Sequence, residues 1–304
     1  MYPIVNSSRK QPIRTPTLTT LTGWIAGLAV MVGVLPPAAH AESGSEVATQ
    51  HVKARLVSEV ASLAPGQAFW VALQFDIAEG WHTYWRNPGD SGLATQLAWR
   101  LPSGFTADDI LWTAPHRFDL PPLVNYGYAG HATHLIRITV PKNSTAGSSA
   151  LLAATASWLV CSDVCIPESA QLKLKLPIGS QAGGHDPADA ALFAAARREL
   201  PIAAPAAATA ELQAGRVIIR LGHEWGATFS SITSLTFFPF DEGAIDYASP
   251  QIFAPTQAGI ELAVKAGNRS QKLDAIRGVL SATGDRGGQT ITVPFEIFVP
   301  LRQP

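Results

Sequence analysis

The stretch QLKLKL at residues 171–176 alternates strictly between a polar residue and leucine. Because successive side chains of a β-strand point to opposite faces, this order places the leucines on a buried face and the lysines in water. Apolar runs of strand length also occur at residues 68–75, 93–99, 135–140 and 151–160, with Gly, Pro, Asn and Asp between them. This spacing predicts an all-β sandwich.

A second strand-rich region follows closer to the C-terminus. Its strand candidates are residues 217–221, 234–238, 260–264, 279–282 and 290–298. Before it, residues 188–200 are good helix formers, and PIAAPAAATAE at residues 201–211 is typical of an extended linker. We therefore expect a first sandwich at residues 42–182, a short helix and Pro/Ala-rich linker at 183–205, and a second sandwich at 206–304.

The N-terminus has the pattern of a secretory signal peptide. Three basic residues precede an apolar run at residues 21–35, which ends at Ala39-His40-Ala41. The small residues predict cleavage after Ala41, so residues 1–41 are a signal peptide and the mature chain is exported. The run is shorter than the roughly 20 residues of a membrane-spanning helix, although retention as an uncleaved anchor stays the alternative.

Composition limits the partners and cofactors. The chain of 304 residues has a formal net charge of −1, and no cluster of Lys and Arg is visible after residue 41. This argues against nucleic acid or an anionic membrane as the partner. Met1 and Met31 both precede the expected cleavage site, which excludes a methionine-lined copper(I) site. His131 and His134 point to opposite faces if they lie on a strand, so we expect no metal and no cofactor.

The chain has only two cysteines, Cys161 and Cys165, in the segment WLVCSDVCIPES at residues 158–169. A disulfide between them closes a loop of five residues and contributes only about 2 kcal/mol by the loop-length formula. This small gain favours redox chemistry, while a local structural clip stays open. Asp163 and Glu168 flank the pair, where negative charge raises the pKa of a thiol, or else both are solvated turn residues.

Three ordered motifs carry a resemblance to a known family. They are GWHTYWRNPGDSG at residues 80–92, PLVNYGYAG at 122–130 and the cysteine segment. Together they resemble the N-terminal periplasmic domain of the thiol:disulfide interchange protein DsbD family. FFPFDEGAIDYASPQ at residues 237–251 further resembles the branch associated with suppression of copper sensitivity, ScsB. The resemblance implies immunoglobulin-like sandwiches and a cysteine pair that shuttles between dithiol and disulfide.

The resemblance also implies roles for particular residues. Cys165 is expected to join the partner and Cys161 to resolve the mixed disulfide, although the sequence alone leaves this order nearly open. Tyr126 aligns with the aromatic–glycine step of the family's cap loop, which shields the cysteines, but the two acidic residues that some members carry before this step are missing here. His82 and Tyr84 fall where the family places side chains near the thiols, and ordinary packing is the alternative for both.

Two functions of different class follow. The first is a periplasmic thiol:disulfide oxidoreductase of the protein-disulfide reductase type, which exchanges electrons with thioredoxin-like proteins. The motifs of the family's membrane and thioredoxin domains are not found in this sequence, so a separate membrane protein is expected as the electron donor. The alternative is a non-catalytic immunoglobulin-like module for partner docking or copper tolerance, in which the disulfide is a structural clip.

Overall fold

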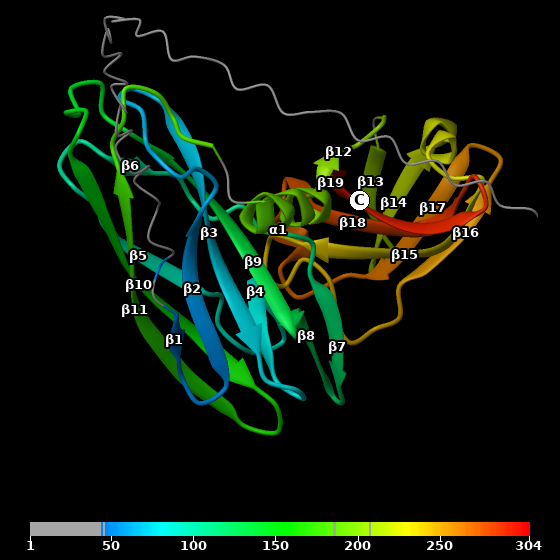
Figure 1. Ribbon diagram of the computed structural model, residues 1–304. Coiled ribbons are helices and arrows are strands. Elements are labelled where there is room, and N and C mark those ends of the chain that lie inside the picture. The colour runs from blue at the N-terminus through cyan, green and yellow to red at the C-terminus, as the bar shows by residue number, and fades with distance from the viewer. Residues whose placement is uncertain (1–43, 45, 185–186, 207) are drawn as a thin grey trace, which may run out of the picture. The chain divides into compact units, whose positions relative to one another are not determined.

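A computed structural model describes residue 44 and residues 46–184, 187–206 and 208–304 (Figure 1). The expected signal peptide at residues 1–41 lies outside the described residues. The fold is built mainly of strands, which form the first sandwich from β1–β11 and the second sandwich from β12–β19. The predicted all-β, immunoglobulin-like architecture is confirmed. Within the described ranges, no helix has both the length and the apolar character that crossing a membrane requires.

One sheet of the first sandwich has five strands in the order β1-β2-β3-β9-β6. Their bounds are Val47–Ala48, Val52–Ser58, Ala68–Ile77, His131–Thr139 and Thr106–Ala107. Alternate residues of β2, β3 and β9 are fully buried and pack toward the other sheet. The strands predicted at residues 68–75 and 135–140 fall largely within β3 and β9.

The other sheet has the order β11-β10-β4-β8-β7, with β5 paired to β10. The bounds are Cys165–Pro177, Ser149–Cys161, His82–Gly89, Leu123–Ala129, His116–Leu120 and Gln96–Arg100. In β11, Leu172, Leu174 and Leu176 are buried whereas Lys173 and Lys175 are exposed, as their alternation predicts. The strand expected at residues 93–99 begins only at residue 96, because residues 90–95 form a loop tied to β8 and packed on β4.

A single α-helix, α1 (Pro187–Glu199), follows the first sandwich among the described residues. Phe193 and Ala196 are buried against Val57, Ala72 and Leu135 of the β1-β2-β3-β9-β6 sheet, and α1 lies beside β9 in Figure 1. The linker then adds β12 (Ile202–Ala203), which pairs in parallel with β19. The helix thus belongs by its packing to the first sandwich.

The second sandwich is built from one eight-stranded sheet in the order β15-β18-β19-β13-β14-β17-β16, with β12 beside β19. The bounds are Ser231–Pro239, Ala275–Arg286, Gln289–Arg302, Ala208–Gln213, Arg216–Gly222, Gly259–Lys265 and Ile252–Thr256. Two short 3₁₀ helices, η1 (His223–Ala227) and η2 (Ser270–Lys272), lie in its connections. Both halves of the sheet contribute buried apolar side chains to the same core.

Aromatic side chains join the two sandwiches. Tyr126 of β8 meets the rings of Phe238 and Tyr247 edge-on, with centroid distances of 4.9 and 5.4 Å. Trp85 of β4 meets Phe238 and Phe240 at 6.3 and 5.7 Å. All but the tilted Trp85–Phe240 pair are edge-to-face, an arrangement that is favourable beyond the area that it buries. The strands of the first sandwich that carry these residues are therefore packed directly on the second sandwich.

Candidate functional site: a disulfide at the end of a β-hairpin

The two cysteines close the turn between β10 and β11. Cys161 is the last residue of β10 and Cys165 the first of β11, and the two face each other directly in the antiparallel register. They form a disulfide with a Cα–Cα distance of 4.2 Å. Ser162, Asp163 and Val164 make the turn, in which the Ser162 N–H donates to the Val164 carbonyl oxygen at 3.1 Å.

The two sulfur-bearing residues differ sharply in exposure. Cys161 is only 1% exposed, whereas Cys165 is an exposed residue. The neighbouring Val164 is 60% exposed, so the open side of the disulfide has an apolar border. An attacking thiolate needs access to the sulfur that it attacks. The geometry therefore favours attack at Cys165 with Cys161 as the leaving group.

Tyr84 covers Cys161 from the neighbouring strand β4. Its hydroxyl donates a hydrogen bond to Cys161 Sγ at 2.8 Å and lies 3.5 Å from Cys165 Sγ. Burial raises the pKa of Tyr84, and a hydrogen bond with Ser91 opposes this only in part. The hydroxyl consequently keeps its proton and remains a donor to sulfur. A hydrogen bond of this kind is stronger to a thiolate than to a disulfide sulfur.

His82 lies directly opposite Cys161 in the β10–β4 pairing. Its ring stacks on Phe118 of β7 at 4.6 Å with an interplanar angle of 17°, and meets Tyr84 edge-on at 5.2 Å. Burial lowers the pKa of His82, which favours the neutral imidazole. Its Nε2 has no hydrogen-bond partner among the described residues. His82 therefore acts as an aromatic spacer between the β7–β8 hairpin and Tyr84.

The loop after β4 holds Tyr84 in place from its other side. The buried Asn125 of β8 donates through its amide nitrogen to the Ser91 carbonyl oxygen at 2.8 Å, and Asp90 accepts the Val124 N–H at 2.8 Å. Gly92 has a φ of +108°, and a Cβ built on it would lie 2.2 Å from Tyr84 Cε1. Only glycine combines this backbone conformation with such a close approach.

The ring contacts of Tyr126 are with the second sandwich. Its ring packs on Phe238 and Tyr247, and its hydroxyl has no hydrogen-bond partner within the described part of the chain. Phe118 is the aromatic residue of the β7–β8 hairpin that reaches the site, through its stack on His82. Sequence reasoning missed Phe118. The signal was present in HRFDLPPL at residues 116–123, where a Pro-Pro turn follows a short strand-like run.

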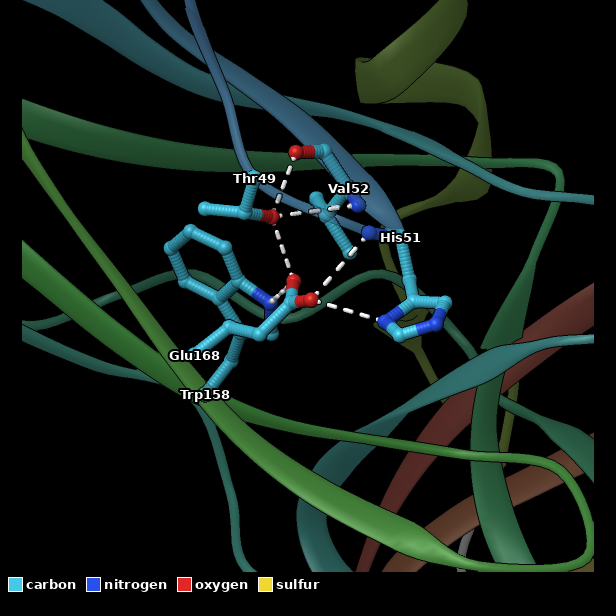
Figure 2. Close-up of polar contacts among 5 residues, drawn as sticks. All are labelled: Thr49, His51, Val52, Trp158 and Glu168. Carbon is cyan, nitrogen blue, oxygen red and sulfur yellow. Dashed lines mark hydrogen bonds and ion pairs between the residues drawn. The ribbon is translucent and has the colours of Figure 1, made fainter.

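The two acidic residues near the cysteines have different surroundings. Asp163 is exposed in the turn between Cys161 and Cys165. The side chain of Glu168 is only 6% exposed. It accepts hydrogen bonds from the Thr49 hydroxyl, from the His51 backbone N–H at 3.1 Å and from Trp158 Nε1 at 3.3 Å, and its carboxylate lies 2.8 Å from His51 Nδ1 (Figure 2). Glu168 thus fastens the N-terminal segment to β11 and is not bonded to either sulfur.

The described residues contain no group of three or more His, Cys, Asp or Glu side chains placed to hold a metal ion. His131 is exposed beside Asp76, and its Nδ1 lies 2.8 Å from Asp76 Oδ1, whereas His134 is fully buried.

Comparisons with known proteins agree with this geometry. Residues 50–177 match the family model described as thiol:disulfide interchange protein DsbD, N-terminal. The N-terminal periplasmic domain of ScsB from Proteus mirabilis is similar in structure, with a TM-score of 0.59 and 14% identity over 85% of this chain and 98% of that chain. Spo0M, a sporulation control protein from Bacillus subtilis, aligns over 82% of this chain and 91% of its own at 10% identity, but its TM-score of 0.22 is too low for a shared fold.

A search of curated protein sequences found no match. The family match covers β2 to β11 and includes both cysteines, Tyr84 and the β7–β8 hairpin. The structural likeness to the ScsB domain extends through most of the chain and so includes the second sandwich. Residues 50–177 therefore match the DsbD N-terminal family in sequence, and the chain has a two-sandwich fold similar to that of the ScsB periplasmic domain.

Proposed function

We propose that this chain is a periplasmic thiol:disulfide exchange module, which relays electrons through Cys161 and Cys165 to or from thioredoxin-like proteins. The observation that carries the proposal is the unequal exposure of the two cysteines. Cys165 is open to a partner, while Cys161 is buried under a hydrogen-bond donor. Export through the expected signal peptide, cleaved after Ala41, places the module in a compartment where disulfides persist.

Reduction of the disulfide proceeds in two steps. A thiolate of the partner attacks Cys165 Sγ, the Cys161–Cys165 bond breaks, and its electron pair leaves on Cys161 Sγ as a thiolate. The Tyr84 hydroxyl, 2.8 Å away, stabilises that thiolate. The mixed disulfide joins Cys165 to the first cysteine of the partner. The partner's second thiolate then attacks the sulfur of that first cysteine, and Cys165 leaves as a thiolate. The module gains two electrons and the partner becomes a disulfide.

In the opposite direction, the reduced module donates electrons. Cys165 attacks the disulfide of the partner and forms a mixed disulfide. Cys161 then attacks Cys165 Sγ, which restores the internal disulfide and releases the reduced partner. The direct opposition of the two residues across the β-hairpin keeps Cys161 within reach for this step.

Trapping of the mixed disulfide tests the proposal. Cys161→Ala leaves the exposed Cys165 without a resolving thiol, so the variant should form a stable adduct with an oxidised periplasmic thioredoxin-like protein on non-reducing gels. Cys165→Ala is the matched control, because the remaining Cys161 is 1% exposed and should form little adduct. Adducts from Cys165→Ala alone reverse the assignment of the two cysteines. If neither variant is trapped, the relay is excluded.

The reduction potential separates a redox pair from a structural clip. Structural disulfides of exported proteins have potentials below about −300 mV. Because the five-residue loop adds little stability to the disulfide, we expect a potential clearly above that value. Equilibration with dithiothreitol or glutathione buffers, followed by alkylation and mass measurement, gives the potential. A pair that stays oxidised at all glutathione ratios supports the clip and the non-catalytic binding module.

A further inference from the structure

Strand β4 covers Cys161 and β7 packs on His82 of β4, and both strands are fastened to the second sandwich. In β4, which carries His82 and Tyr84, the Asn87 amide nitrogen donates to the Pro239 carbonyl oxygen at 2.8 Å. In β7, which carries Phe118, the guanidinium of Arg117 donates through Nη1 to the Tyr247 carbonyl oxygen at 2.7 Å. These hydrogen bonds connect the cover of the disulfide with a region that contains no cysteine.

Tyr247 is the residue where these two connections meet. Its hydroxyl lies 3.3 Å from the Asn87 amide nitrogen and accepts the Gly243 N–H at 2.7 Å. Its ring meets Tyr126 of β8 edge-on, and the residue is only 6% exposed. Backbone, ring and hydroxyl of Tyr247 therefore contact β7, β8 and β4 respectively. Tyr247 is buried and Arg117 is partly buried, so loss of these hydrogen bonds weakens the contact of β4 and β7 with the second sandwich.

Arg117 is well placed to transmit this restraint. Its side chain also forms an ion pair with Asp119, with Nε 2.9 Å from Oδ1, so the guanidinium is held on its own strand as well as on Tyr247. Phe118 follows it directly and stacks on His82. Because Arg117 is held in place, the adjacent Phe118 is held against His82.

We propose that Tyr247 is a positioning residue, through which the second sandwich clamps β4 and β7 so that Phe118, His82 and Tyr84 stay closed over Cys161. The inference rests on the proposed exchange function for its biological meaning. It assigns the second sandwich a role as a rigid support, which keeps Cys161 inaccessible and directs incoming thiolates to Cys165.

Alkylation of Cys161 tests the clamp without any partner protein. In the full chain carrying Cys165→Ala, Cys161 is the only thiol, and its reaction rate with iodoacetamide reports how often the cover opens. Adding Tyr247→Phe removes the hydroxyl contacts with Asn87 and Gly243 and keeps the ring, and adding Arg117→Met removes the bond to the Tyr247 carbonyl oxygen. We expect each to raise the rate fivefold or more, about the effect of losing one hydrogen bond, because Tyr247→Phe removes two contacts and Arg117→Met also removes the ion pair with Asp119.

Matched controls separate the clamp from general damage. Tyr126→Phe removes a tyrosine hydroxyl that has no hydrogen-bond partner among the described residues, and Arg220→Met removes an arginine paired with Glu211 and Glu261 within the second sandwich. Neither should change the alkylation rate. Arg117→Lys, which retains a donor, should restore part of the protection lost in Arg117→Met.

Amide hydrogen exchange supplies the second measurement. The clamp predicts faster exchange in β4, β7 and β8 of the two clamp variants, with unchanged exchange in β18 and β19. The proposal is overturned if Tyr247→Phe and Arg117→Met are alkylated no faster than the two controls. It is also overturned if their alkylation rate rises together with faster amide exchange throughout the chain. If the clamp variants are alkylated faster and the controls are not, but Cys161→Ala traps no partner, the proposed exchange function is overturned and the clamp is not.

Discussion

The Tyr84 hydroxyl lies 2.8 Å from Cys161 Sγ and 3.5 Å from Cys165 Sγ, so one proton donor faces both sulfurs of the disulfide. In the oxidised state the hydroxyl hydrogen-bonds to a neutral sulfur. When Cys165 is attacked, negative charge develops on Cys161, and the same hydrogen bond becomes stronger. This difference between the two states makes Tyr84 a candidate for lowering the barrier of the exchange step.

The first prediction concerns the Tyr84 hydroxyl. Tyr84→Phe should slow reduction of the disulfide by glutathione about tenfold, because a hydrogen bond to a charged group contributes about 1.5 to 3 kcal/mol. Stopped-flow measurement of the reduction rate tests this. Tyr126→Phe is the control, since its hydroxyl lacks a hydrogen-bond partner in the described part of the chain. Equal rates in wild type and Tyr84→Phe exclude a role for the hydroxyl in leaving-group stabilisation.

The second prediction concerns the fit of Gly92 against the Tyr84 ring. Gly92→Ala should move the ring away from Cys161, because the new Cβ would lie 2.2 Å from Cε1. We expect slower reduction, as in Tyr84→Phe, together with a lower melting temperature. Gly147→Ala distinguishes displacement of the Tyr84 ring from the general loss of stability caused by alanine at a positive φ. Gly147 also has a positive φ, of +86°, but a Cβ there meets nothing within 4 Å, so its substitution should cost about 1 kcal/mol without affecting reduction.

The hairpin that carries the disulfide could be predicted from local sequence. The alternation in residues 171–176 defines the faces of β11, and the short CSDVC segment leaves room only for a tight turn. The placement of Phe118 on His82 could not be predicted in this way. It depends on how β7, β8 and β4 pair across the sheet and on contacts with Tyr247 and Pro239, which lie far away in the sequence.

The same limit explains Tyr126 and Glu168. Glu168 stands in the cysteine segment, where proximity in sequence favoured a role beside the cysteines, and Tyr126 stands in the motif at residues 122–130, for which the family resemblance implied one. In the structure the Tyr126 ring packs on Phe238 and Tyr247 of the second sandwich. Glu168 lies opposite Trp158 in the β10–β11 register and bonds with the N-terminal segment. Tertiary contacts of this kind leave no periodic signal in the sequence.

The third prediction concerns pH and His134. This residue is fully buried among the rings of Phe75, Trp112 and Tyr128, and neither ring nitrogen has a hydrogen-bond partner among the described residues. Burial lowers its pKa to about 4, against about 6.5 in the unfolded chain. Between these pH values the unfolded chain binds more protons. The stability contributed by neutral His134 is therefore complete above pH 6.5 and is lost as the pH falls toward 4.

The loss should amount to about 3 kcal/mol in the free energy of unfolding, from the difference between the two pKa values. Urea unfolding of wild type and His134→Phe between pH 4 and 7 measures it, and the variant should show a flatter profile in this interval. His131→Phe, on the same strand but exposed, should keep the wild-type profile. Parallel profiles for wild type and His134→Phe would falsify the assignment of the acid sensitivity to this residue.

The fourth prediction concerns the boundary of the first sandwich. The fragment of residues 42–182 should fold alone and keep thiol exchange, but the fragment of residues 42–200 should be more stable. The longer fragment retains α1, whose Phe193 and Ala196 cover Val57, Ala72 and Leu135, and burial of one phenylalanine contributes about 2 to 3 kcal/mol. Urea unfolding of the two fragments gives the difference directly.

Phe193→Ala in the longer fragment provides the matched test of this explanation. If α1 stabilises the sandwich through its apolar face, the substitution should remove most of the added stability, and Arg198→Ala, on the exposed side of the helix, should not. Equal stability of the two fragments would mean that α1 contributes little to the first sandwich. Aggregation of both would mean that the contacts of Trp85 and Tyr126 with the second sandwich are required for folding, and that the two sandwiches form one folding unit.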